Sequence, residues 1–176
     1  MRARRLLGKV RYVGHNLRFF RVVTALACFA ALTGCSQSEE AKPTLGEAVT
    51  QLVGDADRLL ASAELKASGA ATATEKAETD QSGACPPGEV QRFYRAQGEL
   101  SGPSSRQSPH DAAALMRGAL RNMGYEQIVD DLDVRDEKLS VVVLRKRQSG
   151  TTFVIAVRTA TQPNILIIGK TDCLTA

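Results

Sequence analysis

The chain has 176 residues, 43% of them hydrophobic and 24% charged, with a formal net charge of +4 at pH 7. Seven of its 23 Lys and Arg residues lie in the first 21, so residues 35–176 hold 16 Lys or Arg against 19 Asp or Glu, a balance of −3. That part lacks the basic footprint of a nucleic-acid-binding protein, and no nucleic-acid partner is expected.

The N-terminal residues have the pattern of an export signal. Residues 1–21 contain no Asp or Glu, and residues 22–32 (VVTALACFAAL) contain no charge. A basic arm followed by a short apolar run is typical of a signal peptide, and a buried core helix is the alternative. The 11 residues reach only about 16 Å as a helix, too short for a bilayer core of roughly 30 Å. Sec export is expected, although Arg4 and Arg5 loosely resemble a twin-arginine signal.

The apolar run ends in Leu32-Thr33-Gly34-Cys35, which resembles the lipobox of bacterial lipoproteins. The resemblance implies that the Cys35 sulfur takes a diacylglycerol and that a peptidase cuts between Gly34 and Cys35. Small residues before the cysteine suit a narrow peptidase cleft, and a thiol is a strong nucleophile. We therefore expect residues 1–34 to be a lipoprotein signal peptide and the rest to be anchored to the extracytoplasmic face of the cell membrane.

The remaining cysteines predict one disulfide. Cys28 lies in the signal and Cys35 carries the lipid, which leaves Cys85 and Cys173 in an oxidising compartment. Closing so long a loop is worth up to about 4–5 kcal/mol by loop entropy. With His110 as the single histidine of this part, the residues cannot fill a tetrahedral metal site, and no metal or cofactor is expected.

Three segments are predicted between the lipid and the folded domain. Residues 35–43 form a polar tether, and residues 44–65 form an amphipathic helix that begins with a capping box of Thr44 and Glu47. Three roles are open for this helix: it packs on the domain, it binds a partner, or it lies on the membrane surface. Residues 66–84 contain no bulky apolar side chain, which predicts a flexible linker.

Residues 85–176 predict a disulfide-closed α+β domain with an antiparallel sheet of four or five strands, mostly a C-terminal meander, and one helix packed on it. The expected elements are a strand over 89–96, a helix over 109–123 that Gly124 ends, and strands over 127–134, 138–147, 151–159 and 164–170. The strands over 138–147 and 151–159 are apolar on both faces in their centres. Such strands are covered on both sides, and the two helices are the expected covers.

Catalytic and metal motifs are weak in this sequence. His110 stands beside Asp111 and near Ser104, Ser105 and Ser108, so a hydrolase triad is conceivable. We instead expect His110 to be a surface residue in the first helical turn, because the helix dipole there disfavours a protonated histidine. The acidic run 130–137 offers Asp131 and Asp133 to calcium, but it lacks the spacing of a calcium loop and better fits a solvated strand edge.

A basic cluster flanks the turn at Ser149 and Gly150. Its members are Arg145, Lys146, Arg147 and, across the turn, Arg158. The cluster is either a binding patch for an anionic ligand, such as a wall polymer or lipid headgroup, or a solubilising turn.

The lipobox, the low-complexity tether and the small two-cysteine domain together resemble small lipoproteins of actinobacteria. We therefore expect a non-enzymatic cell-envelope lipoprotein whose domain binds a partner protein or envelope ligand, with no catalytic residues. A small envelope hydrolase and a ligand-carrying lipoprotein are the alternatives. An exposed apolar groove on the sheet favours the binding hypothesis, whereas a cleft that gathers His110, a serine and a carboxylate favours the hydrolase.

Overall fold

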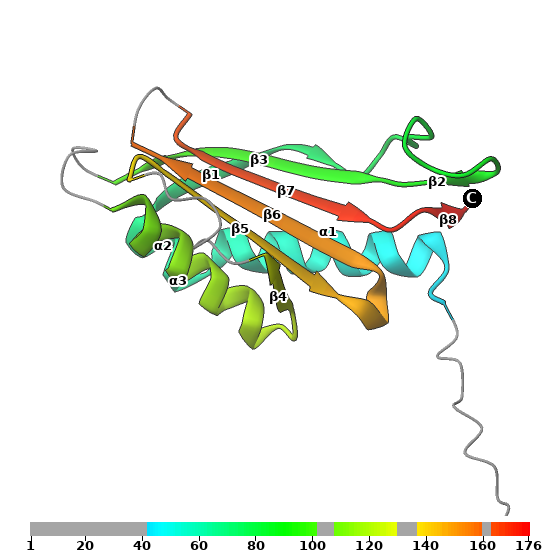
Figure 1. Cartoon of the computed structure of the whole chain (residues 1–176), viewed down its shortest axis with the longest axis horizontal. Coiled ribbons are helices and arrows are strands. Elements are labelled where there is room, and N and C mark those ends of the chain that lie inside the picture. The colour runs from blue at the N-terminus through cyan, green and yellow to red at the C-terminus, as the bar shows by residue number, and fades with distance from the viewer. Residues whose placement is uncertain (1–41, 102–107, 130–136, 160–162) are drawn as a thin grey trace, which may run out of the picture. The chain divides into compact units, whose positions relative to one another are not determined.

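The computed structural model describes residues 42–101, 108–129, 137–159 and 163–176 (Figure 1). The described helices are α1 (Leu45–Ala61), α2 (Ala63–Ser68), α3 (Pro109–Asn122) and the 3-10 helix η2 (Arg147–Ser149). The described strands are β1 (Gly69–Lys76), β2 (Glu89–Val90), β3 (Phe93–Leu100), β4 (Glu126–Val129), β5 (Leu139–Lys146), β6 (Thr151–Arg158), β7 (Ile165–Thr171) and β8 (Leu174–Thr175). The predicted signal peptide with its lipobox, and residues 35–41 of the predicted tether, lie outside the described part.

The long strands form a six-stranded antiparallel sheet in the order β1-β3-β7-β6-β5-β4, and β2 pairs with β8 in a two-stranded sheet. The α+β class, the antiparallel sheet and the C-terminal meander are therefore confirmed. The predicted count of four or five strands was too low. The strand expected over 89–96 is also divided, because β2 and β3 belong to different sheets.

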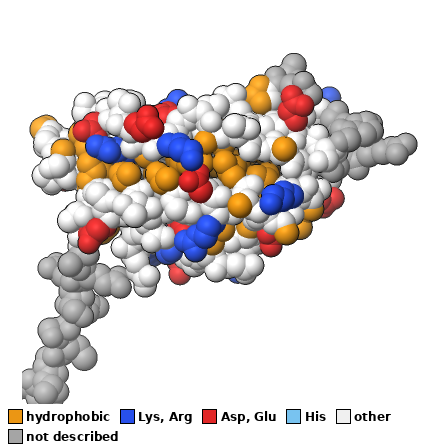
Figure 2. All heavy atoms as spheres, turned by 180° about the vertical axis from the view of Figure 1, so that it is seen from behind, with side chains coloured by type: hydrophobic (Ala, Val, Ile, Leu, Met, Phe, Trp, Pro, Cys, Tyr) orange, Lys and Arg blue, Asp and Glu red, His pale blue; other side chains and the backbone are white. Residues whose placement is uncertain are grey.

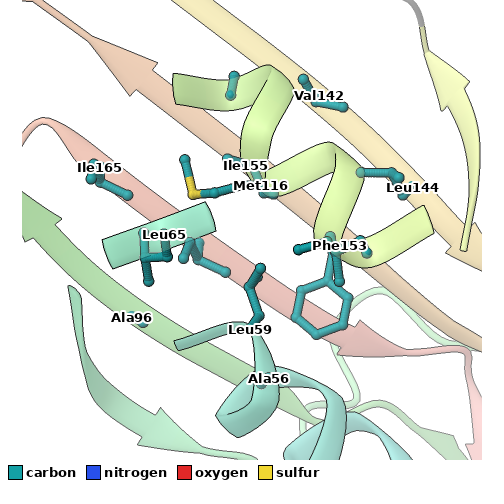
Figure 3. Packing of buried hydrophobic residues seen from close by; sticks show 14 of the residues in the cluster. Ala56, Leu59, Leu65, Ala96, Met116, Val142, Leu144, Phe153, Ile155 and Ile165 are labelled. Carbon is teal, nitrogen blue, oxygen red and sulfur yellow. The ribbon is translucent and has the colours of Figure 1, made fainter. Parts of the chain in front are cut away.

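The three α-helices α1, α2 and α3 pack on the same face of the large sheet. Leu59 of α1, Leu65 of α2 and Met116 of α3 meet Ile155 and other strand residues in one core (Figure 3). Packing of α1 is mainly against β7, and packing of α3 is against β5 and β6. Gly169 of β7 permits the close approach of α1, because a Cβ atom there would lie 2.6 Å from Leu52 Cδ1.

Helix α1 begins as predicted and ends earlier. The Thr44 backbone N–H donates to Glu47 Oε2 at 2.9 Å, and the Glu47 N–H donates to Thr44 Oγ1 at 3.3 Å, which completes the capping box. The hydrogen bond from the Thr44 N–H lowers the pKa of Glu47. Ser62 then leaves the helical conformation and caps α2 by accepting from the Leu65 N–H at 3.2 Å. The predicted single helix over 44–65 is therefore two helices.

The flexible linker predicted over 66–84 is wrong in its first half. Residues 69–76 form β1, which pairs with β3 from Gly69 opposite Leu100 to Lys76 opposite Tyr94. Small Ala and Thr side chains contribute little burial, but backbone hydrogen bonds to a neighbouring strand hold such a segment in a sheet. The folded domain therefore begins well before Cys85.

The predicted disulfide is present. Cys85 and Cys173 are bonded, with their Cα atoms 5.5 Å apart. The bond lies beside the small β2-β8 sheet, where Val90 packs against Leu174 and the start of α1. It therefore ties the segment before β2 to the segment after β7.

Helix α3 follows its predicted boundaries closely. Ser108 occupies the N-cap position, although its side chain makes no capping hydrogen bond, and Pro109 is the first helical residue. The helix ends at Asn122, two residues before Gly124, whose φ of 87° is left-handed. Gly124 therefore plays the predicted C-terminal role.

Candidate functional site

The second face of the large sheet is apolar in its centre, and no helix among the described residues covers it. Register and alternation place seven apolar side chains of β5, β6 and β7 there, all partly exposed, which we call the open face: Leu139, Val141, Val143, Val154, Ala156, Leu166 and Ile168. Their alternating neighbours, such as Val142, Ile155 and Ile167, are fully buried under the helices. At strand spacings the open face covers roughly 300 Å², a patch size that on a soluble protein is often functional.

Charged side chains border the open face. On β3, Arg95 forms an ion pair with Glu75 at 3.2 Å, and its guanidinium lies 5.2 Å from the centre of the Phe93 ring. On β5, Arg145 pairs with Asp172 at 2.6 Å. An apolar centre with a polar margin is the anatomy of a binding surface.

The open face deepens into a hollow of about 300 Å³ at the end farthest from the η2 turn. Its lining residues come from β3, β5, β6 and the β7 region: Gln97, Leu139, Ala156, Arg158, Pro163, Asn164 and Leu166. Mostly apolar walls with a few polar groups at the rim are typical of small-molecule sites.

The predicted basic cluster is dispersed. Arg145 and Lys146 point to opposite faces of the sheet, because they are neighbours on one strand. Lys146 Nζ lies 3.5 Å from Asp55 Oδ2, whereas Arg145 pairs with Asp172. Arg158 pairs in register with Leu139, about 24 Å along β6 from the turn, so it does not join the others. Only Arg147, in η2, stays at the turn itself.

Lys146 instead belongs to a buried polar cluster around Asp55. The Asp55 carboxylate is fully buried and accepts hydrogen bonds from Gln51 Nε2 at 2.7 Å, Tyr125 Oη at 3.0 Å and the Arg58 guanidinium. Tyr125 Oη is also hydrogen-bonded to Thr151 Oγ1 at 2.9 Å. Burial raises the pKa of Tyr125 above its usual value. The cluster joins α1 to β5 and to the segment after α3, and it is a structural feature of the helical side.

Hydrophobic side chains also gather along the seam between α1 and β1, which Figure 2 shows as a band bordered by charged side chains. The partly buried residues there include Val49, Val53 and Leu60 of α1 and two alanines of β1. Lys76 bridges the seam to Asp57 at 3.2 Å.

Asp57 also accepts a hydrogen bond from Tyr94 Oη at 2.8 Å. That hydrogen bond, with the nearby Lys76 ammonium, lowers the pKa of Asp57. Burial raises the pKa of Tyr94, and the Asp57 carboxylate adds to the effect. These contacts fasten α1 to β1 and β3 across the seam.

The other residues of chemical interest are not gathered into a cleft by the described part of the chain. His110 and Asp111 lie in the first turn of α3. Ser104, Ser105, Asp131 and Asp133 lie outside the described residues. No group of His, Cys, Asp and Glu side chains suited to a metal ion occurs among the residues that the structure describes.

The sequence contained a signal for the open face that we interpreted differently. Strands apolar on both faces were expected to be covered by one helix on each side, whereas α1 and α3 both cover the same side. The signal was therefore real, and the expected cover was wrong. Nothing in the sequence alone identified Ala156 or the hollow, because the hollow depends on which residues oppose Ala156 across the sheet.

Comparison with protein families, curated proteins and solved structures gives no match for this chain. Within the described ranges, no helix is long and apolar enough to cross a membrane. The functional conclusion is therefore drawn from the residues and their geometry.

Proposed function

We propose that this chain is a non-enzymatic lipoprotein of the cell envelope, anchored through Cys35, whose domain binds a partner protein or envelope ligand on the open face. The observation that carries the proposal is the apolar centre of the second face of the sheet, which no described helix covers. Val141, Val143 and Val154 are β-branched side chains of central strands, which fold to be covered on both sides. A partner or ligand that binds over these side chains would explain why they are apolar.

The position of the N-terminal segment supports an anchored domain with an accessible face. Pro43 Cγ lies 3.5 Å from where a Cβ atom on Gly150 would stand, so the chain enters the domain at the η2 end. From Cys35 to Pro43 an extended chain reaches at most about 28 Å. A lipid on Cys35 would therefore keep the η2 end within about 28 Å of the bilayer surface.

The lipid anchor is tested by labelling cells that express the full chain with an alkyne fatty acid. We expect the label on the wild type and none on the Cys35→Ser variant. Equal labelling of the two chains, or a protein that retains residues 1–34 in a lipoprotein-competent bacterium, would refute the anchor.

Binding on the open face is tested by site-specific photocrosslinking in native membranes. A photoreactive residue replaces Val143 on the open face or, as a matched control, the exposed Thr50 on the outer side of α1. We expect a discrete adduct from position 143 that is lost when Val154 and Ile168 are both changed to Lys. The same adducts from both positions, or an adduct that survives the lysine substitutions, would contradict the proposal.

A further inference from the structure

The hollow on the open face combines an apolar floor with a cation at its rim. Leu139, Ala156 and Leu166 supply the floor from three neighbouring strands, and Arg158 lies at the end of β6. Apolar groups and a guanidinium in one small hollow match a ligand with an aliphatic part and an anionic end.

The hollow exists because Ala156 is small. In the register of the sheet, Ala156 lies between Leu166 of β7 and Val141 of β5, and Gln97 of β3 continues the row. Each neighbour of Ala156 on this face has a larger side chain, so the missing volume is local to one residue. A larger side chain at position 156 would fill the hollow without entering the core under the helices, because Ala156 faces the open side.

Arg158 is held in place by the protein and retains donors for a ligand. Its Nε and NH2 atoms donate to the Pro163 carbonyl at 3.3 and 3.1 Å. Among the residues that the structure describes, no carboxylate forms an ion pair with it. A guanidinium has five N–H donors, so three remain for another acceptor, and its planar fork can bind a carboxylate through two parallel hydrogen bonds.

We infer that this hollow binds an aliphatic carboxylate, with the hydrocarbon chain on Leu139, Ala156 and Leu166 and the carboxylate on Arg158. This inference rests on the binding role proposed above and names its ligand class. The lining residues extend from Gln97 on β3 to Leu139 on β5, across three strand spacings or roughly 14 Å, which suits a single chain of about ten carbons. A volume of about 300 Å³ is at the lower limit for small-molecule sites, which also indicates one short chain.

Size argues against a second copy of the chain as the occupant. A stable protein interface buries about 800 Å² on each partner, of which roughly 450 Å² is apolar, whereas the open face offers roughly 300 Å² of apolar surface. A single aliphatic acid is small enough for the hollow of about 300 Å³.

The inference is tested by isothermal titration of hexanoate, octanoate and decanoate into the full chain carrying Cys35→Ser, which has no acyl chain of its own to compete. We expect affinity to rise by up to about fourfold for each methylene that is buried. Ala156→Leu should weaken decanoate binding about tenfold or more by filling the hollow, and Arg158→Gln should do so by removing a charge-assisted contact. The matched controls Ala67→Leu in α2 and Arg121→Gln in α3, both at exposed positions on the helical side of the sheet, should change affinity by no more than about twofold.

Three results would overturn the inference. These are no binding of decanoate by the wild type, equal affinity across the three chain lengths, or unchanged binding by Ala156→Leu. Decanol binding as tightly as decanoate would remove the role of Arg158 and would also refute the ligand class. The Val143 crosslink distinguishes the two proposals. If the crosslink forms but decanoate does not bind, the binding role of the open face stands and only the ligand class is rejected. If neither the crosslink nor decanoate binding is found, both proposals are rejected.

Discussion

Replacing Asp55 by Asn should destabilise the domain strongly. The carboxylate has no exposed surface and accepts from Gln51, Arg58 and Tyr125, with Lys146 Nζ 3.5 Å away. An amide keeps one acceptor oxygen and turns its NH2 group toward donors, so part of this cluster loses its partner. Breaking a buried ion pair costs about 3–5 kcal/mol. Because 62% of the Arg58 side chain is exposed and can be rehydrated, we expect the lower end, about 3 kcal/mol.

The measurement is urea unfolding followed by far-UV circular dichroism, with the disulfide kept oxidised. With a slope of about 2 kcal/mol/M, the midpoint should fall by about 1.5 M. Asp57→Asn is the matched control on the same helix: the Asp57 side chain is 46% exposed, and an amide oxygen can still accept from Tyr94 Oη. Its cost should be at most about 1 kcal/mol. If the two variants unfold at the same urea concentration, our account of the Asp55 cluster is wrong.

Three further changes test the packing, the disulfide and the buried tyrosines. Gly169→Ala places a Cβ atom 2.6 Å from Leu52 Cδ1 and 2.8 Å from Phe153 Cε1, so urea unfolding should show a loss of about 1–3 kcal/mol. Gly118→Ala in α3, where nothing lies within 4 Å, should instead gain about 0.5–1 kcal/mol, and the same sign for both variants would contradict the packing. Replacing Cys85 and Cys173 by Ser should cost about 2–5 kcal/mol and lower the melting temperature, which an unchanged melt would refute. Burial raises the pKa values of Tyr94 and Tyr125, so their contribution to stability is complete below pH 10.0, the ordinary tyrosine pKa, and is lost as the pH rises above it. The urea midpoint should fall between pH 8 and pH 11 by less in Tyr125→Phe than in the wild type, and equal falls would argue against this role of Tyr125.

Elements with strong local signals could be predicted from the sequence. Pro109 and Gly124 bound α3 within a residue or two, because a proline in the first turn and a glycine after the last act through their own backbone. The Cys85–Cys173 bond followed from elimination among the cysteines. The meander of β5, β6 and β7 followed from apolar runs separated by turn residues, since neighbouring strands in sequence commonly pair.

Elements that depend on distant partners could not be predicted in this way. The residues of β1 carry no apolar pattern, and their order comes from hydrogen bonds to β3, whose first residue lies 17 positions after the last residue of β1. The prediction of a basic cluster was wrong for a related reason. Sequence proximity placed Arg145, Lys146 and Arg158 together, but strand alternation separates the first two, and the length of β6 removes the third.

The open face shows how a correct pattern can lead to a functional hypothesis through a wrong expectation. Strands with apolar centres on both faces require two covers, and the two long helices of this chain were the expected covers. However, α1 and α3 each bury an apolar stripe that the same fully buried residues, Phe153 and Ile155 among them, complete in one core. The other face then retains branched apolar side chains whose burial the described part of the chain does not complete. Because these residues surround a small alanine and border an arginine that is held by a carbonyl, we propose a ligand rather than a third helix as the missing cover.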